Sequence, residues 1–570
     1  MQWRSKARQT EKRMRKRVIV LTILILAIVL PVCRYGPRVY SRWEQRRLTA
    51  QSQELLQKGD YKRAALSLRR TIELNPNNIT ATRLFAQLAD KIGKPETVSL
   101  WERVCALSPN SFEDSYAWAS AALKFGDTAR AQQAASIMQK TGANRGGYHE
   151  ILARLALYAG QSEEARSQFS EALKIEPENE TYQLELATLD AQANDSSTRE
   201  PALQSLQRLR AVPAFRLAAL RVLVSVYATH GDIAAALPLA KELAMDPAAA
   251  VQDKLLYLSV LHGSRNPQFA AYLSSLQESA KDKEFEAAAL IGWLNAHKLA
   301  MLSHEWLETL PQTVTSKPPV APKAAETDVS LSDWQGLYTL TNTTSWGDSD
   351  FMRLAFLSLA SLRKGDAAGS DAQWKTAVAQ AAKRPDGLSL LEKTAIAWRW
   401  DARLEELRWF IAKTSKYPQQ ALGALVERYQ RARDTHNLYR VVCSLHELDP
   451  ANAGIKNNWV MLSLLLHNDI DQAAQAAQEL CEANPTDVHA IATYGFALYM
   501  TNRTDDALEV MRKLTPEQLK TPSIAGYYGV MLAAVHDPEA SKFLNQAQSQ
   551  QLLPEEEQLF LKAKRSLAEL

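Results

Sequence analysis

Residues 146–179, GGYHEILARLALYAGQSEEARSQFSEALKIEPEN, decide the fold of this chain. The spacing of their apolar residues predicts two short amphipathic helices, joined by a turn at 158–162. Gly160 suits that turn because glycine adopts backbone conformations that other residues avoid. Pro177 ends the second helix because proline has no N–H group to continue it. The stretch therefore predicts a helical hairpin.

The two helices of this hairpin carry mostly small or apolar residues on the faces that would meet. A helix pair this short cannot bury its apolar face alone, so it must stack on neighbouring pairs. The predicted packing residues are Leu152, Ala153, Ala156 and Leu157 in the first helix and Ala165, Phe169 and Ala172 in the second.

The pattern resembles the tetratricopeptide repeat, a 34-residue unit of the form W-x2-L-G-x2-Y, then A-x3-F, then P. The matching positions hold His149, Leu152, Ala153 and Ala156, and then Ala165, Phe169 and Pro177. Turns of the same kind recur at Gly59-Asp60, Gly93, Gly126-Asp127, Gly231-Asp232 and Gly365-Asp366. The resemblance implies an all-α, right-handed superhelical solenoid of antiparallel helix pairs.

The solenoid is expected in two parts, residues 45–310 and residues 334–570. Between them, 311–333 holds four prolines and is predicted to be a Pro-rich connector, either a long loop between repeats or a hinge. The last helix begins near Leu553 with proline and acidic residues, which favour a helix N-terminus, and is the expected capping helix.

Charge is distributed unevenly along the 570 residues, whose formal net charge is +4. Residues 1–47 hold 13 Lys/Arg against 2 Asp/Glu, and the remaining residues hold 54 against 61. The basic character thus belongs to the N-terminus alone. A basic tail before an apolar run fits membrane topology better than nucleic-acid binding.

The apolar run is Val18–Cys33, VIVLTILILAIVLPVC, without a charged residue. As a helix its sixteen residues span about 24 Å, and Arg17 and Arg34 can reach the headgroups by snorkelling. A cleaved signal peptide is the first alternative, but no small-x-small cleavage site follows. A buried soluble helix is the second. We predict a basic tail at 1–17, a transmembrane anchor at 18–33 and a juxtamembrane stem at 34–44.

Eight Lys/Arg precede the apolar run and five follow it by Arg47. This excess favours a cytoplasmic N-terminus, with the solenoid on the other side of the membrane. The anchored layout resembles tetratricopeptide proteins of the bacterial envelope. The expected location is the inner membrane, crossed once, with the solenoid in the periplasm.

Motifs that carry chemistry are missing from the sequence. The four cysteines form no C-x-x-C, the histidines form no H-E-x-x-H, and no phosphate-binding glycine loop or nucleophile elbow occurs. We therefore expect no enzyme, no metal, no cofactor and no small-molecule substrate. Cys105, Cys443 and Cys481 are expected to be buried free thiols, with a Cys443–Cys481 disulfide as the alternative. The tryptophans between Trp293 and Trp409 are expected to pack in the core between helices, and the alternative is that they line an aromatic ligand groove.

The remaining candidate site is the surface made by the first helix of each repeat, which lines a concave groove in the tetratricopeptide family. The resemblance implies that this groove binds partner peptides or helices, so the expected function is a scaffold or assembly factor. An accessory or regulatory subunit of an envelope enzyme, or of a polysaccharide export or secretion machine, is the alternative. The groove candidates are Glu150, Arg154, Leu157, Asn458, Leu462, Leu465, Ala492, Phe496 and Tyr499. Of these, Leu462, Leu465, Phe496 and Tyr499 are expected to be exposed although apolar or aromatic.

Overall fold

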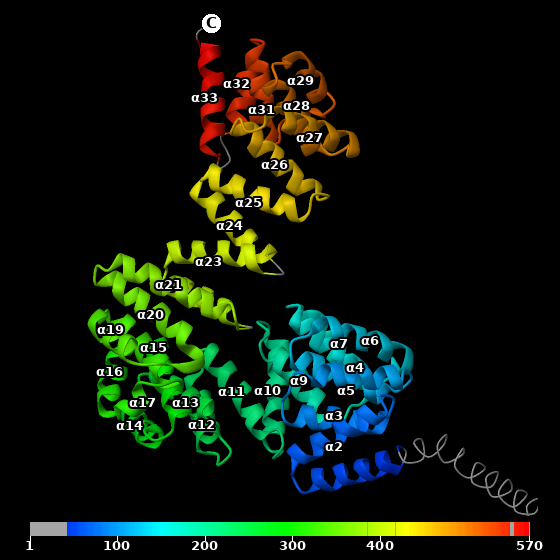
Figure 1. The fold of residues 1–570 in the computed structure, drawn as a ribbon, viewed down its shortest axis with the longest axis vertical. Helices are drawn as coiled ribbons and strands as arrows, with labels where there is room; N and C mark the ends of the chain where they lie inside the picture. Colours follow the sequence, from blue (N-terminus) through cyan, green and yellow to red (C-terminus); the bar gives the residue numbers. More distant parts are fainter. Residues whose placement is uncertain (1–40, 42, 385, 416–417, 548–551, 569–570) are drawn as a thin grey trace, which may run out of the picture. The chain divides into compact units, whose positions relative to one another are not determined.

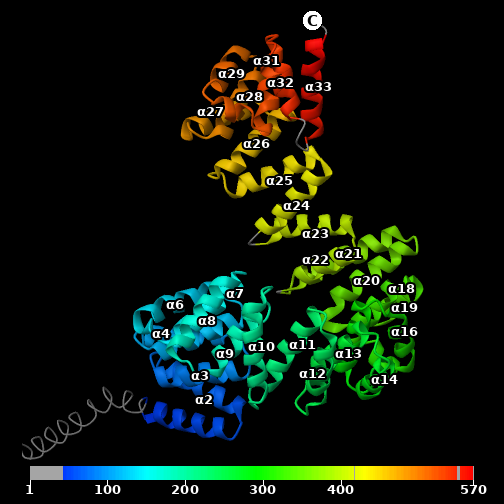
Figure 2. The ribbon, with the colours of Figure 1, turned by 180° about the vertical axis from the view of Figure 1, so that it is seen from behind.

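A computed structural model describes residues 41, 43–384, 386–415, 418–547 and 552–568. Helices make up all the regular structure of these residues (Figures 1 and 2). The chain divides into two compact units, one ending at Ser279 and the other beginning at Ala280. The predicted all-α class is therefore confirmed for the part of the chain that the structure describes.

In the first unit a helix at 43–57 comes before the helices of the succeeding hairpins. These are α2 (Tyr61–Leu74), α3 (Ile79–Lys91), α4 (Thr97–Leu107), α5 (Phe112–Lys124), α6 (Thr128–Gly142), α7 (Gly146–Tyr158), α8 (Ser162–Ile175), α9 (Glu180–Asp190), α10 (Ser196–Arg210), α11 (Arg216–Thr229), α12 (Ile233–Met245), α13 (Val251–Gly263) and α14 (Phe269–Ala280).

The second unit repeats the hairpin scheme and ends in one further helix. Its elements are α15 (Glu284–Ala296), α16 (Ala300–Thr309), α17 (Gln312–Thr315), α18 (Val320–Leu331), α19 (Trp334–Thr343), the 3-10 turn η1 (Gly347–Ser349), α20 (Asp350–Arg363), α21 (Ala367–Ala381), α22 (Gly387–Ala397), α23 (Asp401–Thr414), α24 (Gln419–Ala432), α25 (Thr435–Leu448), α26 (Ala453–Leu465), α27 (Ile470–Ala483), α28 (Val488–Met500), α29 (Thr504–Met511), α30 (Pro516–Leu519), α31 (Pro522–Ala534), α32 (Ala540–Gln546) and α33 (Pro554–Ala568).

The turn inside almost every hairpin contains a residue with positive φ, in the left-handed backbone conformation. This feature recurs along the whole described array. In α7–α8, Gly160 has φ +73°, its N–H bonds to Leu157 and the next N–H bonds to Ala156. These two hydrogen bonds close the end of the first helix. Successive positions lie 33 to 35 residues apart, except for one interval of 71 that covers two hairpins: Gly59, Gly93, Gly126, Gly160, Gly231, Arg265, Lys298, Ser332, Gly365, Arg399, Arg433, His467, Asn502 and His536.

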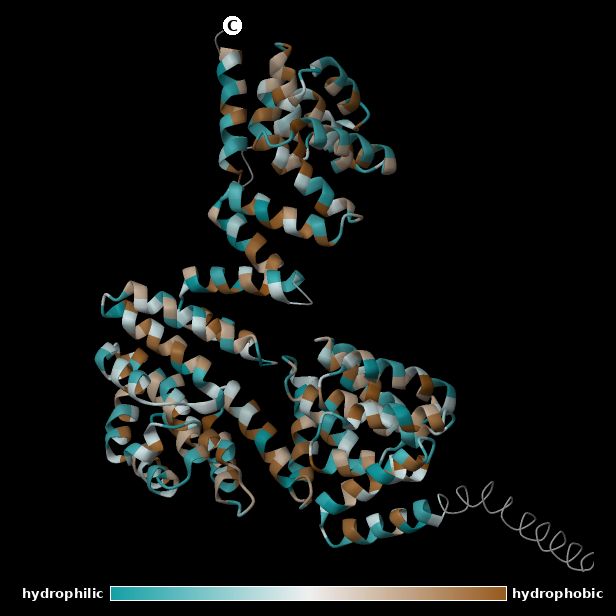
Figure 3. Ribbon diagram, viewed as in Figure 1, coloured by the Kyte–Doolittle hydropathy of each residue, from teal (hydrophilic) through white to brown (hydrophobic). Residues whose placement is uncertain are grey.

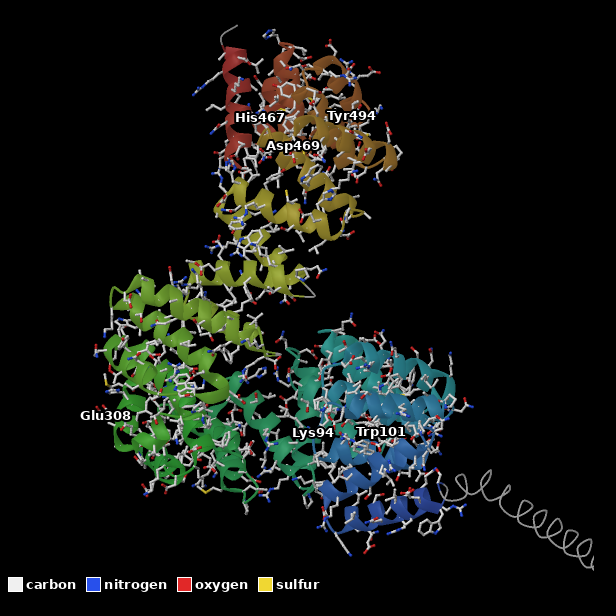
Figure 4. The ribbon with its side chains drawn as sticks, viewed as in Figure 1. Lys94, Trp101, Glu308, His467, Asp469 and Tyr494 are labelled. Atoms are coloured by element: carbon white, nitrogen blue, oxygen red, sulfur yellow. The ribbon has the colours of Figure 1, made fainter. Side chains whose placement is uncertain are left out.

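The second helix of many hairpins begins with an acidic cap directly after this turn. Asp60, Asp127, Asp232 and Asp366 each accept a hydrogen bond from the backbone N–H three residues on. The Gly-Asp pair therefore ends one helix and starts the next. The turn between α26 and α27 departs from this scheme, because His467 and Asp469, labelled in Figure 4, both have positive φ.

Most of the predicted packing residues form the core of the α7–α8 hairpin, but Leu157 is exposed and its prediction as a packing residue is wrong. Ala153, Ala165, Phe169 and Ala172 are all fully buried. Figure 3 shows brown and teal residues alternating around the helices, as expected when each helix buries one face. Larger clusters elsewhere are built on the same plan, and most of the tryptophans between Trp293 and Trp409 lie in or against them.

Residues 311–333 differ from the predicted Pro-rich connector, because they contain α17 and α18. Pro319 stands at the N-cap of α18 and Pro322 lies in its first turn, where no helical N–H is needed. Beyond the prolines the segment buries Ala324 and Ala325. Ser332 then takes the left-handed turn position. The prolines thus begin a repeat helix and do not interrupt the array.

The predicted anchor, 18–33, and the basic tail lie outside the described residues. Among the residues that are described, no helix combines the length and the apolar character needed to cross a bilayer.

Candidate functional site

Nothing in the described part of the chain gathers the groups needed for metal binding. No cluster of three or more His, Cys, Asp or Glu side chains occurs there. Cys105, Cys443 and Cys481 are free thiols, so the alternative Cys443–Cys481 disulfide is not formed. Burial raises the pKa of the Cys105 thiol to about 11, which keeps it protonated and unreactive at neutral pH.

The candidates of the first unit, Glu150, Arg154 and Leu157, lie on α7. Glu150 is buried and accepts a hydrogen bond from the Tyr116 hydroxyl of α5 at 2.7 Å. Arg154 pairs with Glu150 at 3.0 Å and with Glu185 of α9 at 3.6 Å. Only Leu157 of the three is exposed. The two charged residues therefore tie successive first helices together and are largely used within the array.

Ion pairs of this kind recur between first helices one repeat apart. Arg83 of α3 binds Asp114 of α5 with two hydrogen bonds, of 2.9 and 2.7 Å. Arg221 of α11 binds Asp253 of α13 in the same way, at 2.6 and 2.8 Å, and these bonds hold the pKa of Asp253 below its usual range. Sequence reasoning missed these pairs, although opposite charges 31 or 32 residues apart were the available signal.

The second unit contains a recess of about 340 Å³ between the first helices of successive repeats. Three elements build its floor, namely α24, α26 and α28, while α25, α31 and the start of α33 complete its walls. Its apolar lining residues are Val426, Leu438, Val442, Leu445, Ile455, Met461, Leu462, Leu465, Ala492, Ile524 and Leu553.

Four of the predicted groove residues come together in this recess: Asn458, Leu462, Leu465 and Ala492. Asn458 is exposed, but Leu462 and Leu465 are largely covered by neighbouring helices, at 5% and 7% exposure. The expectation that both leucines are freely exposed is therefore wrong. They form the floor of a hollow and not a raised apolar patch.

Phe496 and Tyr499 do not line the recess. Phe496 is fully buried, with its ring 4.6 Å from that of Tyr527 on α31, and Tyr499 is half-buried against the same core. The expected exposure of Phe496 is wrong because the next first helix, α31, lies across it. Tyr494 of the same helix, labelled in Figure 4, also packs partly buried against this core.

Polar side chains surround the mouth of the recess. Gln430, Asn458, His489 and Ser523 are exposed there. Glu556 is the one acidic lining residue among those described, and it accepts hydrogen bonds from the Tyr527 hydroxyl and from the Leu553 N–H, the latter at 2.7 Å. The described lining of the recess thus offers apolar side chains, hydrogen-bonding groups at the mouth and no Lys or Arg.

Comparison with known proteins identifies part of this region. Residues 464–528 match the family model of the tetratricopeptide repeat. The match covers the end of α26, α27 to α30 and the start of α31, and thus includes the recess residues Leu465, Ala492 and Ile524. None of the curated proteins matches the chain.

Three of the solved structures with some likeness to this chain share 13% to 17% of its residues over the matched part. A tetratricopeptide repeat protein from Parabacteroides merdae is 14% identical over 43% of this chain and 96% of its own, with a TM-score of 0.36. The Cut9-Hcn1 hetero-tetramer of the APC/C is 13% identical over 82% and 99%, with a TM-score of 0.30. MamA from Desulfovibrio magneticus RS-1 is 17% identical over 29% and 92%, with a TM-score of 0.26.

Proposed function

We propose that this chain is a scaffold or assembly factor that binds partner proteins through the recess of its second unit. The supporting observation is that first helices of successive tetratricopeptide-type repeats share one apolar hollow with a polar rim. Pockets of this composition bind ligands by burying apolar groups and orienting them with a few hydrogen bonds. We assign no catalytic residue, cofactor or small-molecule substrate to the chain.

We further propose that residues 18–33 anchor the chain in the inner membrane. The N-terminus would lie in the cytoplasm and the repeats in the periplasm. The support is the uncharged apolar run and the larger number of Lys/Arg before it than after it. Anchoring would hold the recess near partners that share the membrane.

A role as accessory subunit of an envelope enzyme, or of a polysaccharide export or secretion machine, is the second candidate. The two roles differ in what stays bound after purification: one stable enzyme indicates the accessory role, whereas several transient partners indicate the scaffold.

Site-specific photocrosslinking in native membranes tests the proposal. The crosslinking amino acid p-benzoylphenylalanine is placed at Asn458 or Ser523, both exposed at the recess rim. The matched control is Glu482, which is exposed on the second helix of the Asn458 hairpin. We expect mass spectrometry to find the same partner from both rim positions and not from Glu482. Equal products from all three positions, or none from the rim, would refute the recess as the binding site.

A further inference from the structure

The start of α33 contacts a part of the chain far away in the sequence. The Arg433 Nε donates a hydrogen bond to the Leu552 carbonyl at 2.7 Å, and the Arg433 guanidinium pairs with Glu557 at 2.6 Å. The Thr435 hydroxyl bonds to Glu555. These partners are 119 residues or more apart, whereas repeats in a solenoid usually contact only their neighbours.

These contacts place Leu553 and Glu556 in the wall of the recess. Leu553 packs against the apolar cluster of α24, α25 and α26. Glu556 bonds to Tyr527 of α31. The first turn of α33 thus joins the helices on the two sides of the recess.

The rest of α33 holds this turn in place from behind. Phe560 is buried with its ring 5.5 Å from that of Tyr527. It lies so close to Gly526 on α31 that a Cβ atom at that position would come within 2.4 Å of the ring. The helix is therefore a packed part of the unit, and only its first turn borders the recess.

The lining also limits what the recess can accept. Glu556, the one acidic group of its described lining, already has two hydrogen-bond donors, and no Lys or Arg lines the hollow. An anionic ligand group would lose its hydration without meeting a Lys or Arg, and the Glu556 carboxylate would repel it, which is unfavourable. An uncharged apolar group loses nothing of this kind. The volume of about 340 Å³ suits one or two side chains of leucine or phenylalanine size.

We propose that the recess binds an uncharged apolar segment of a partner, and that Arg433 and Thr435 position its wall by fastening the first turn of α33. This inference rests on the proposed protein-binding role, whose partner it describes by chemistry. Neither Arg433 nor Glu557 lines the recess, so they act through Leu553 and Glu556 and not by touching the ligand.

Charge exchange in the full-length protein tests the positioning role. The probe is N-phenyl-1-naphthylamine, an uncharged aromatic fluorophore, and its anionic relative 1-anilinonaphthalene-8-sulfonate tests the preference for neutral groups. Binding in the recess is measured as the difference in probe fluorescence between the wild type and Ala492→Phe in the same lipid or detergent. The larger side chain of Ala492→Phe fills the hollow. Arg433→Glu and Glu557→Arg are compared singly and together.

We expect each single variant to weaken binding of the neutral probe by about three- to fivefold, the upper range for one exposed ion pair. The double variant should recover affinity because it restores an ion pair with the charges reversed. Unchanged thermal melting of Glu557→Arg shows that its loss is local, and this variant decides the matter if Arg433→Glu unfolds.

Unchanged or tighter binding in the single variants would overturn the inference, since α33 would then be irrelevant to the recess or would block it. Equal affinity for the anionic probe would overturn the preference for neutral groups. These results are independent of the photocrosslinking at Asn458: a failed search for partners refutes the protein-binding role and leaves the probe measurements valid.

Discussion

The left-handed turn position permits a test in which the same chemical change has opposite effects at two sites. Gly365 lies in the turn between α20 and α21 with φ +90°, and Gly423 lies exposed within the helix α24. Both belong to the second unit. A Cβ atom added at either glycine meets no atom within 4 Å, so neither change to alanine causes a clash. Any difference between the two variants must therefore come from the backbone.

The expected magnitudes follow from backbone preferences alone. A left-handed conformation costs an alanine about 1–2 kcal/mol, from which about 0.4–1 kcal/mol is offset by the smaller entropy of the unfolded chain. Gly365→Ala should thus destabilise its hairpin by about 1 kcal/mol. Gly423→Ala should stabilise α24 by about 0.5–1 kcal/mol, since glycine within a helix is unfavourable.

Native-state hydrogen exchange followed by mass spectrometry measures both effects locally, because solenoid repeats open in small cooperative groups. A change of 1 kcal/mol alters the opening equilibrium about fivefold. We expect faster exchange in α20 and α21 for Gly365→Ala and slower exchange in α24 for Gly423→Ala. Effects of the same sign in both variants would refute the argument that the turn backbone sets the stability of the hairpin.

The other predictions concern the core, pH and the membrane. Phe169→Ala removes a fully buried side chain and should cost about 3–5 kcal/mol, with exchange increasing near α8 while the second unit stays protected. Phe496→Ala should lower the melting temperature together with partner capture, because Phe496 is core; capture lost without any loss of stability would contradict this. Burial and then the Asp333 carboxylate raise the pKa of Asp328 to about 7, so the folded chain holds a proton that the unfolded chain has lost between about pH 4 and 7. The free energy of unfolding should fall by at most about 4 kcal/mol as pH rises through that window. Denaturant titrations at several pH values should show a smaller fall with pH for Asp328→Asn than for the wild type. The full chain should stay in the membrane fraction after alkaline carbonate washing, and a soluble form beginning after Cys33 would mean that 18–33 is a signal peptide.

Local chemistry explains why the hairpins could be predicted from the sequence. The turn at Gly160 needs a residue that tolerates positive φ, and Ala165 and Phe169 must recur at helical spacing to reach the neighbouring helix. Each requirement involves residues less than one repeat apart. The helices within 311–333 are hard to predict because proline commonly breaks a helix, whereas Pro319 and Pro322 stand where α18 begins.

The candidate site could be predicted only in part, because helical spacing does not say which neighbour covers a given face. Leu462 and Ala492 reach the recess as the repeat position implies, but the ring of Tyr527 covers Phe496 four residues after Ala492. Whether a first-helix residue is open or buried thus depends on the side chain that the next repeat presents. A large aromatic residue on α31 closes one turn of α28 and leaves the preceding turn open.

Sequence periodicity also cannot reveal the contact between Arg433 and the start of α33. The pairs Arg83–Asp114 and Arg221–Asp253 join adjacent repeats. The two partners of each pair are 31 or 32 residues apart, nearly one repeat, so each pair follows from the stacking of hairpins. The contact from Arg433 to Leu552 joins residues 119 positions apart, so it does not follow from the stacking of adjacent hairpins. It joins the α24–α25 hairpin directly to the start of α33. The description of a solenoid by contacts between neighbouring repeats alone therefore leaves out this contact, which lies beside the recess residue Leu553.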